Sequence, residues 1–327
     1  MSRYYEVTVI DPADNLTMKK WTSEPLPGVF DPQAQNIDFD LLAYNYATPA
    51  GASTLSIEGV SIQDIGQAQM FTGMTVQIKG GMKKGLPLAK PSQSGVLLTG
   101  QVFQSFGNWE GTNMTLDFVF LASPYTFDQP GNFVLTCPKG TNLSGPIKQM
   151  LAANFPTAQI VLNLNPNRVY GYDLHHAAHT LEQASDFIRE VSKGQFGITD
   201  PGIQVTMTGA GNFYIYDYTQ PSNPIALDFN DFVGQPVWIA PYKIQMTLVL
   251  RADLSVGTLI KMPANIKNLP GIVTTQPASL PSYNKYSSVF QGNFYITSLR
   301  HVGNFRSPAG ENWVTIAEAV FAGRIES

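Results

Sequence analysis

Alternation of apolar and polar residues is the feature that most constrains the fold of this chain. Apolar side chains recur at every second position near the start, at Tyr5, Val7 and Val9. A period of two is typical of half-buried antiparallel strands. The pattern returns in segments separated by turn residues: Ile37 to Leu41, Val76 to Ile78, Met114 to Phe120 and Ile244 to Leu250. Many short strands with turns between them predict β-barrels or β-sandwiches.

Two segments with helical spacing of apolar residues interrupt this pattern in the middle of the chain. The first is expected to begin at a Ser144 cap. Thr180 and Gln183 form a capping-box pattern at the start of the second, and Gly194 is expected to end it. Strand-like segments follow each helix. Residues 126–232 are therefore predicted to form a small α+β domain between two β-domains.

Two distant parts of the chain share one order of features. The segment AQMFTG, which ends at Gly73, matches ADLSVG, which ends at Gly257. Each is followed by an aromatic strand, beginning at Gly100 or Gly292, and by a Gly-Asn-aromatic turn. Any two β-domains share alternation and turn glycines, but we favour two related β-barrels with the α+β domain inserted between them. The predicted domains are residues 1–125, 126–232 and 233–327.

Composition narrows the classes of function. Charged residues make up 13% of the 327 residues, roughly half the usual share, which favours a surface partly buried in an assembly. A net charge of −4 argues against binding driven by nucleic-acid phosphates. Cys137 is the single cysteine, so no intramolecular disulfide can form. We find no signal-peptide pattern and no apolar run of about 18 residues, and expect folding in a cytoplasm.

Three of the four histidines, His175, His176 and His179, lie close together. On a helix, His175 and His179 would share one face, as a zinc pair requires. The zinc-protease pattern needs a glutamate where His176 stands, and only Asp173 offers a further ligand nearby. We expect surface histidines in the connection before the second helix and no metal. A metal-dependent cell-wall hydrolase using His175 and His179 is the weaker alternative.

No other catalytic pattern emerges from the sequence. Gly80 and Gly85 have phosphate-loop spacing, but Leu86 and Pro87 occupy the places of the required Lys and Ser/Thr. Cys137 has no histidine near it in sequence. We therefore expect no enzyme and no cofactor. A glycan- or receptor-binding β module is a further alternative, with three candidate stacking residues: Trp109, Trp238 and Trp313.

The closing segment GNFYITSLRHVGNFRSPAGENWVTIAEAVF resembles the last strands of bacteriophage baseplate hub (tail hub) proteins. The segment LVLRADLSVGTLIKMP resembles the family's preceding strand-turn-strand, with Gly257 in the turn. GGMKKGLPLAKPSQSGVLLTGQVFQSFGNWEGTNMTLDF resembles the first barrel of a hub subgroup. The positions that match the family's closing pattern are Gly292, Phe294, Ile296, Leu299, His301, Gly303, Trp313 and Thr315.

This resemblance implies a mainly β protein in which two tail-tube-like barrels flank the α+β domain. It implies a homotrimer whose six similar barrels form a ring between a sixfold tail tube and a threefold spike. The expected partners are a tail tube or distal tail protein ring, a separate spike protein and a tape measure protein, with DNA passing unbound. The expected location is the virion baseplate, after assembly in the host bacterial cytoplasm. The resemblance implies no active site.

Overall fold

The computed structural model describes residues 3–46, 52–82, 91–121, 130–198, 200–220, 222–263 and 292–322. Most of the rejected phosphate loop, residues 83–90, lies outside the described residues. The first β unit comprises, in the described part of the chain, β1 (Arg3–Ile10), β2 (Thr17–Thr22), β3 (Asn36–Tyr44), β4 (Ser53–Glu58), α1 (Ile62–Gly66), the 3-10 turn η1 (Ala68–Phe71), β5 (Thr75–Met82), η2 (Pro91–Gln93), β6 (Gly95–Glu110) and β7 (Asn113–Leu121).

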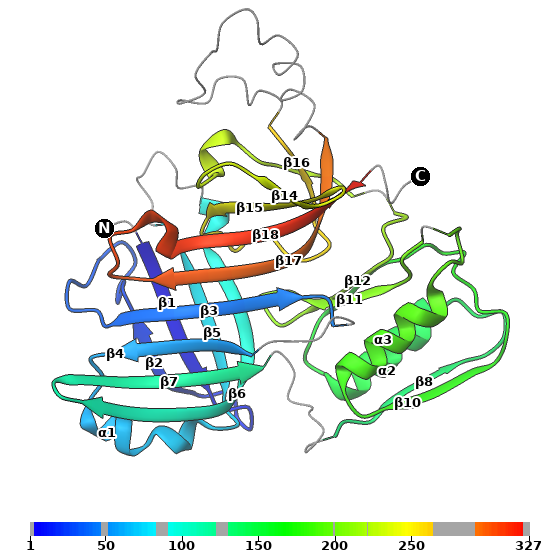
Figure 1. Cartoon of the computed structure of the whole chain (residues 1–327). Helices are drawn as coiled ribbons and strands as arrows, with labels where there is room; N and C mark the ends of the chain where they lie inside the picture. The colour runs from blue at the N-terminus through cyan, green and yellow to red at the C-terminus, as the bar shows by residue number, and fades with distance from the viewer. Residues whose placement is uncertain are drawn as a thin grey trace, which may run out of the picture.

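The first β unit is an antiparallel sheet that curls back on itself, with strand order β3-β4-β7-β6-β5-β1-β2 (Figure 1). The predicted alternation is realised, because Tyr5, Val7 and Val9 of β1 are fully buried. Trp21 of β2 meets Phe118 of β7 with ring centroids 6.2 Å apart. This contact packs β2, the last strand of the curled sheet, against β7 and encloses one apolar core.

The second β unit comprises, among the described residues, β13 (Ile225–Ala226), η3 (Phe229–Asp231), β14 (Val237–Ala240), β15 (Lys243–Val249), β16 (Leu259–Lys261), β17 (Asn293–Asn304), η6 (Gly310–Asn312) and β18 (Trp313–Phe321). Its strand order is β14-β15-β18-β17, with β16 beside β17 and β13 beside β16. Because β17 also pairs with β3, the two β units form one continuous sheet (Figure 1).

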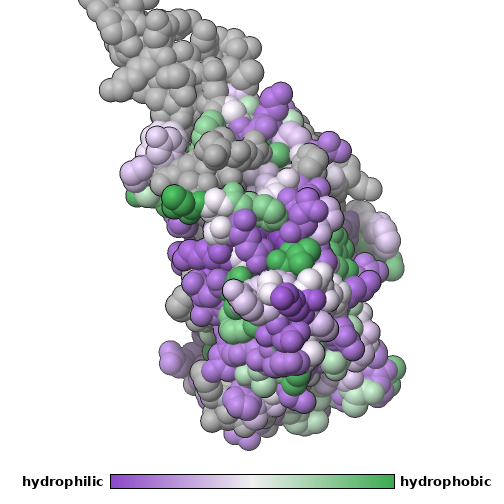
Figure 2. Space-filling view, turned by 90° about the vertical axis from the view of Figure 1, so that its right-hand side faces the viewer, coloured by the Kyte–Doolittle hydropathy of each residue, from purple (hydrophilic) through white to green (hydrophobic). Residues whose placement is uncertain are grey.

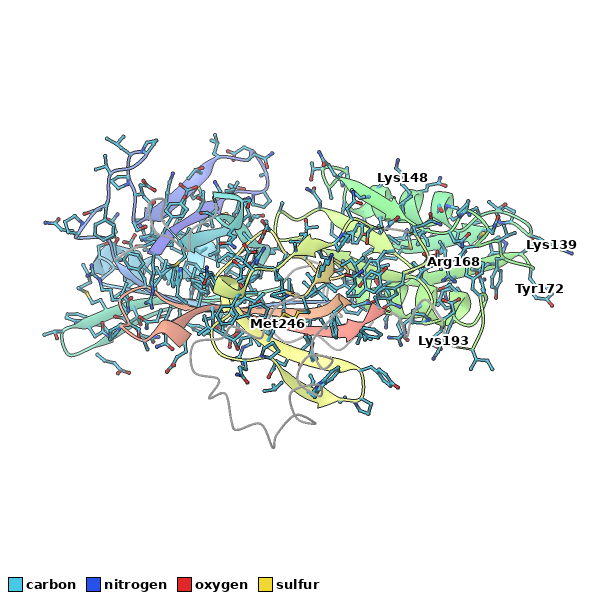
Figure 3. The ribbon with its side chains drawn as sticks, turned by 90° about the horizontal axis from the view of Figure 1, so that it is seen from above. Lys139, Lys148, Arg168, Tyr172, Lys193 and Met246 are labelled. Carbon is cyan, nitrogen blue, oxygen red and sulfur yellow. The ribbon has the colours of Figure 1, made fainter. Side chains whose placement is uncertain are left out.

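The middle unit comprises β8 (Phe133–Cys137), α2 (Ser144–Asn154), β9 (Ile160–Asn163), β10 (Leu174–Ala178), α3 (Leu181–Ser192), β11 (Gln204–Met207) and β12 (Phe213–Tyr216). It projects to one side of the β units, with Lys139 and Tyr172 at its far end (Figure 3). Both helices and both small sheets share one apolar core. The predicted fold class, mainly β with an α+β insertion, is confirmed.

The helix ends test the sequence patterns at single residues. The predicted Thr180 cap of α3 is confirmed, since its hydroxyl accepts a hydrogen bond from the Gln183 N–H at 3.3 Å. Ser144 is not a cap, because α2 begins at that residue and Asn142 Oδ1 accepts its N–H at 2.8 Å. No helix of the described residues is long and apolar enough to span a bilayer.

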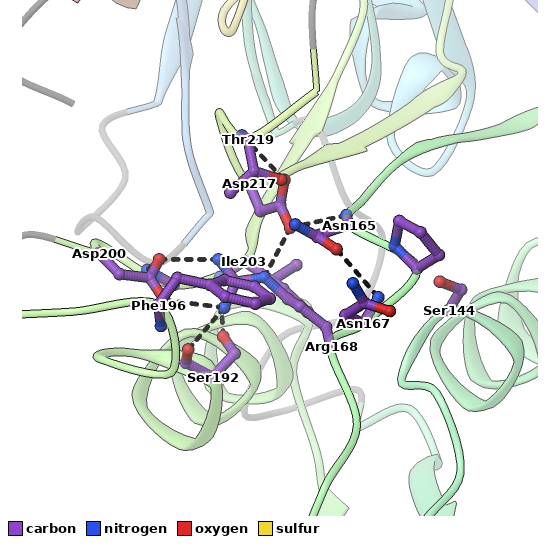
Figure 4. A network of polar contacts seen from close by, with 12 residues as sticks. Ser144, Asn165, Asn167, Arg168, Ser192, Phe196, Asp200, Ile203, Asp217 and Thr219 are labelled. Atoms are coloured by element: carbon purple, nitrogen blue, oxygen red, sulfur yellow. Dashed lines mark hydrogen bonds and ion pairs between the residues drawn. The ribbon is translucent and has the colours of Figure 1, made fainter. Parts of the chain in front are cut away.

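A buried cluster of charges holds the middle unit together (Figure 4). The Arg168 guanidinium is fully buried and bonds to Asp217 at 2.6 Å, to Asp200 at 2.7 Å and to the Ser192 carbonyl at 2.7 Å. Burial alone would raise the pKa of Asp200, but bonds from Arg168 and from two backbone N–H groups hold that pKa below its usual value. The cluster joins the segments that follow β9, α3 and β12.

Replacing Arg168 with alanine is expected to lower the free energy of unfolding by about 3–5 kcal/mol, because two carboxylates lose their buried partner. Chemical denaturation followed by circular dichroism measures this. Arg189→Ala is the control: Arg189 pairs with Asp186, whose side chain is 54% exposed, so the loss is under about 1 kcal/mol. Equal losses in the two variants would contradict a structural role for the cluster.

Candidate functional site

The two β units meet where the second half of β17 pairs with β3 in antiparallel register. Ser298 lies opposite Tyr44, and Asn304 lies opposite Asp38. On the outward face, Arg300 forms a bidentate ion pair with Asp40, at 2.5 and 2.8 Å. Main-chain pairing over this length fixes both the separation and the rotation of the two units, since neighbouring strands lie about 4.8 Å apart. We call this pairing the unit junction.

Gly303 and Trp313 form the inward side of the unit junction. Phe39 of β3 lies opposite Gly303, and a Cβ atom at Gly303 would collide with the Phe39 ring. Trp313 is 2% exposed, packs against Phe39 at 5.3 Å between centroids and donates its indole N–H to the Gly81 carbonyl at 3.0 Å. Gly81 belongs to β5, so Trp313 of the second unit completes the core of the first.

His301 lies in the unit junction between Leu41 of β3 and Thr315 of β18. Its Nδ1 is 2.9 Å from the Thr315 hydroxyl, which accepts the Arg251 backbone N–H at 3.0 Å. Burial lowers the pKa of His301 to about 4, so the imidazole is neutral at pH 7. A neutral, fully enclosed histidine of this kind serves packing rather than proton transfer.

Gly257 and Gly292 lie elsewhere in the second unit. Gly257 has φ +86°, and a Cβ there would lie 2.5 Å from the Tyr216 ring of the middle unit. Its missing side chain therefore lets the middle unit pack against the second β unit. Gly292 has φ +107° and lies directly before β17, beside the Phe321 ring. The structure brings His301, Gly303 and Trp313 together, whereas Gly257 and Gly292 occupy separate contacts.

The predicted internal repeat is present in the hydrogen bonds. The Gly73 N–H bonds to the Val102 carbonyl and the Val102 N–H to the Met74 carbonyl, both at 2.8 Å. Likewise, the Gly257 N–H bonds to the Ile296 carbonyl at 2.8 Å and the Ile296 N–H to the Thr258 carbonyl at 3.0 Å. A β-bulge follows Val102 in β6 and Ile296 in β17. The order β3-β4-β7-β6-β5 thus corresponds to β14-β15-β18-β17-β16.

The residue alignment predicted for the repeat needs one correction. Gly73 does match Gly257, but Val76 lies opposite Gly100 whereas Ile260 lies opposite Phe294. Gly100 therefore corresponds to Phe294 and not to Gly292. The expected Gly-Asn-aromatic turn in the first copy is wrong as well, since residues 107–109 continue β6. The bulges, which shift the register by one residue, were not apparent in the sequence.

Two of the three clustered histidines lie in a strand, whereas His179 lies in the predicted connection directly before the Thr180 cap of α3. His175 and His176 belong to β10, where His176 stacks on Phe187 at 3.6 Å between ring centroids. His175 and His179 are both exposed, and they do not share a helical face, since His175 lies in β10 and His179 follows the end of that strand. Among the described residues, no group of three or more His, Cys, Asp and Glu could hold a metal.

The three candidate stacking tryptophans differ in exposure. Trp313 is buried in the unit junction and offers no ring face to a glycan. Trp109 is 62% exposed near the end of β6, and Trp238 is 43% exposed in β14. These two lie on different β units and form no shared platform in one chain.

Replacing Gly303 with alanine is expected to lower the free energy of unfolding by about 1–3 kcal/mol, because the new methyl group displaces the Phe39 ring. Gly310→Ala is the matched control, since no atom lies within 4 Å of a Cβ at that position. Thermal unfolding of both variants measures the difference. A Gly303→Ala protein as stable as the control would contradict the close packing of the unit junction.

Acidification is expected to weaken the fold through His301. The unfolded histidine binds a proton below pH 6.5 but the buried one does so only near pH 4, so its stabilising effect is full above pH 6.5 and falls as the pH drops. Between pH 6.5 and 5 the loss amounts to about 2 kcal/mol. Denaturation at several pH values, with His301→Asn as reference, tests this. An unchanged slope in the variant would contradict the assignment.

Comparison with known proteins adds the likeness of fold. No protein-family model and no curated protein matches this sequence. Among solved structures, the chain is similar to the 43 kDa tail protein of prophage MuSo2 from Shewanella oneidensis, with 10% identity, a TM-score of 0.52, and coverage of 99% of this chain and 98% of that chain. A tail protein from Neisseria meningitidis is similar too, with 10% identity, a TM-score of 0.51 and the same coverage. The resemblance to phage tail proteins is thereby confirmed as one of fold, over the whole chain.

Proposed function

We propose that this chain is a structural baseplate hub, three copies of which form a ring between a sixfold tail tube and a threefold spike. The observation that carries the proposal is the internal repeat, in which two β units share strand order, hydrogen bonds and bulge positions. Each β unit forms one sixth of the ring, so three chains supply its six units. The full-length similarity of fold to phage tail proteins supports this role.

The orientation of the two units favours a ring. At the unit junction, β3 of the first unit meets β17 of the second, so the repeat is joined through two different surfaces. Such head-to-tail contacts propagate in one direction and close into a ring when the rotation between units fits. Two units per chain reconcile threefold symmetry with six similar docking positions. A tube with sixfold symmetry then meets one face and a threefold spike the other.

The role proposed here involves no catalysis and no bound metal or cofactor. His301 is enclosed and neutral, and His175 lies on a strand rather than on the helix that a zinc pair with His179 would need. The ring would stay in the virion tail after assembly in the host cytoplasm, with a tape measure protein and DNA passing through its centre. A net charge of −4 is consistent with DNA passage without retention.

The purified chain is expected to form a species of three times 35.8 kDa, about 107 kDa. Light scattering coupled to size exclusion, over a tenfold concentration range, measures this mass. A dimer that persists across the range would contradict the ring. A monomer that assembles only when tail tube protein is added would still support it, whereas a monomer under both conditions would not.

A further inference from the structure

Within the described part of the chain, β14 is an edge strand. It is the last strand in the sheet order and pairs with β15. All four of its residues are exposed, and three of them are large and apolar: Val237 at 52%, Trp238 at 43% and Ile239 at 44%. A strand edge with exposed apolar side chains is a template for adding another strand. The face of the molecule on the side of the middle unit differs, since its apolar residues are separate spots among hydrophilic ones (Figure 2).

The second half of β6 is another strand edge in the first β unit, with α1 and η1 covering its inward face: Ile65 packs against Gly107, and Ser105 donates to the Ala68 carbonyl at 2.5 Å. β5 pairs with β6 only as far as Gln101, and within the described residues no strand pairs with the same side of residues 104–110. Two exposed aromatic residues lie in this half, Phe106 at 47% and Trp109 at 62%. In the second unit, the corresponding half of β17 is the segment that β3 covers at the unit junction.

The repeat relates these two edges to the unit junction. β6 corresponds to β17, whose second half is paired, and β14 corresponds to β3, which is the strand that pairs with it. One chain therefore uses the β17 edge and the β3 edge against each other. It leaves the equivalent β6 edge and β14 edge at its two ends. The β6 edge and the β14 edge are therefore complementary to each other in the same way as the β17 edge and the β3 edge.

The repeat also fixes the register between the two edges. Ser53 lies opposite Phe120 and Ile244 lies opposite Ala319, at the last pairs before the two bulges, which aligns β4 with β15. Their next residues pair with Asp40 and with Val237 respectively. Transferring the pairing of the unit junction gives two expected pairs between copies, Gly107 with Trp238 and Asn108 with Val237. The transfer ends at Trp238, because a β-bulge at Ile239 follows it in β14.

We propose that β14 of one copy adds to the second half of β6 of the next copy, in the register of the unit junction. This inference rests on the proposed ring and names its subunit contact. Gly107 would take the place of His301 and Trp238 that of Leu41, with Ile65 of α1 packed against the inward side of Gly107. On the outward face, Asn108 and Val237 take the places of Val302 and Asp40.

Cysteine cross-linking tests the contact and its register. Directly opposite residues in antiparallel strands have Cα atoms about 4.5 or 5.5 Å apart, within reach of a disulfide. The variant Asn108→Cys with Val237→Cys is therefore expected to form covalent dimers and trimers on oxidation, seen on a non-reducing denaturing gel. Native Cys137 is fully buried, so the unmodified chain is the background control. Both substituted side chains are exposed, so folding is preserved.

The register control combines Phe106→Cys with Val237→Cys. These residues share a face but lie diagonally, with Cα atoms about 7–8 Å apart, beyond ordinary disulfide reach. Cross-linking of the first pair and not of the second supports the register. Equal cross-linking of both pairs would overturn the register, and cross-linking of neither would overturn the contact.

A positive charge introduced on the β14 edge tests the proposed contact separately from the proposed function. Ile239→Lys is expected to reduce the trimer mass threefold, to that of a monomer, because an edge lysine opposes strand addition. Val134→Lys is the matched control, since Val134 is an exposed strand valine of the middle unit. A trimer that survives Ile239→Lys and lacks the disulfide would refute this contact and leave the hub standing. An unmodified chain that never assembles, even with tail tube protein, would refute both.

Discussion

The pairing of β17 with β3 is the interaction on which the rest of the structure depends. It turns two separate strand sets into one sheet and sets their relative position by main-chain hydrogen bonds. Side chains then make that position unique, because the Phe39 ring fills the space that Gly303 leaves and Trp313 bonds to Gly81. A shift of one residue would turn every side chain of β17 to the opposite face.

The middle unit packs against both β units. Tyr216 packs where Gly257 lacks a side chain, and Tyr218 continues to Tyr295 with ring centroids 4.7 Å apart. On the other side, Thr99 of β6 donates to the Gly209 carbonyl at 2.8 Å. The insertion therefore contacts both β units. We infer that it braces the two β units against each other.

The two kinds of contact differ in chemistry for a physical reason. Within the chain, the covalent connection keeps β3 and β17 at high effective concentration, so a polar outward pair such as Arg300 and Asp40 suffices. A contact between copies must supply its own free energy of association. Burial of apolar side chains is the largest source of such free energy. The apolar Phe106 and Ile239 at the free edges agree with that requirement.

The sequence predicts the parts of this fold that depend on local patterns. Alternation at Tyr5, Val7 and Val9 predicted β1, and the Thr180 pattern predicted the start of α3. The strand β10, which contains His175 and His176, was not predicted. It is short, and the stacking of His176 on Phe187 is a tertiary contact that the local sequence does not reveal. Likewise, the Arg168 cluster joins segments far apart in sequence, so no spacing rule predicts it.

The unit junction was only partly predictable. Gly303 and Trp313 were identified through the family pattern, but their common partner, Phe39, appeared only as one residue of an alternating strand. The free edges were missed for a similar reason, because VWIA in β14 is too short to distinguish an exposed edge from a buried strand. Pairing between distant strands decides that distinction, and a single sequence does not contain it.

End-on images of the assembled particle by electron microscopy test the central claim most directly. The account predicts a closed ring with six similar lobes at low resolution, which resolve into alternating first and second β units related by threefold symmetry. A particle with twofold symmetry, or a ring whose lobes do not alternate, would contradict the claim that each chain contributes two equivalent units.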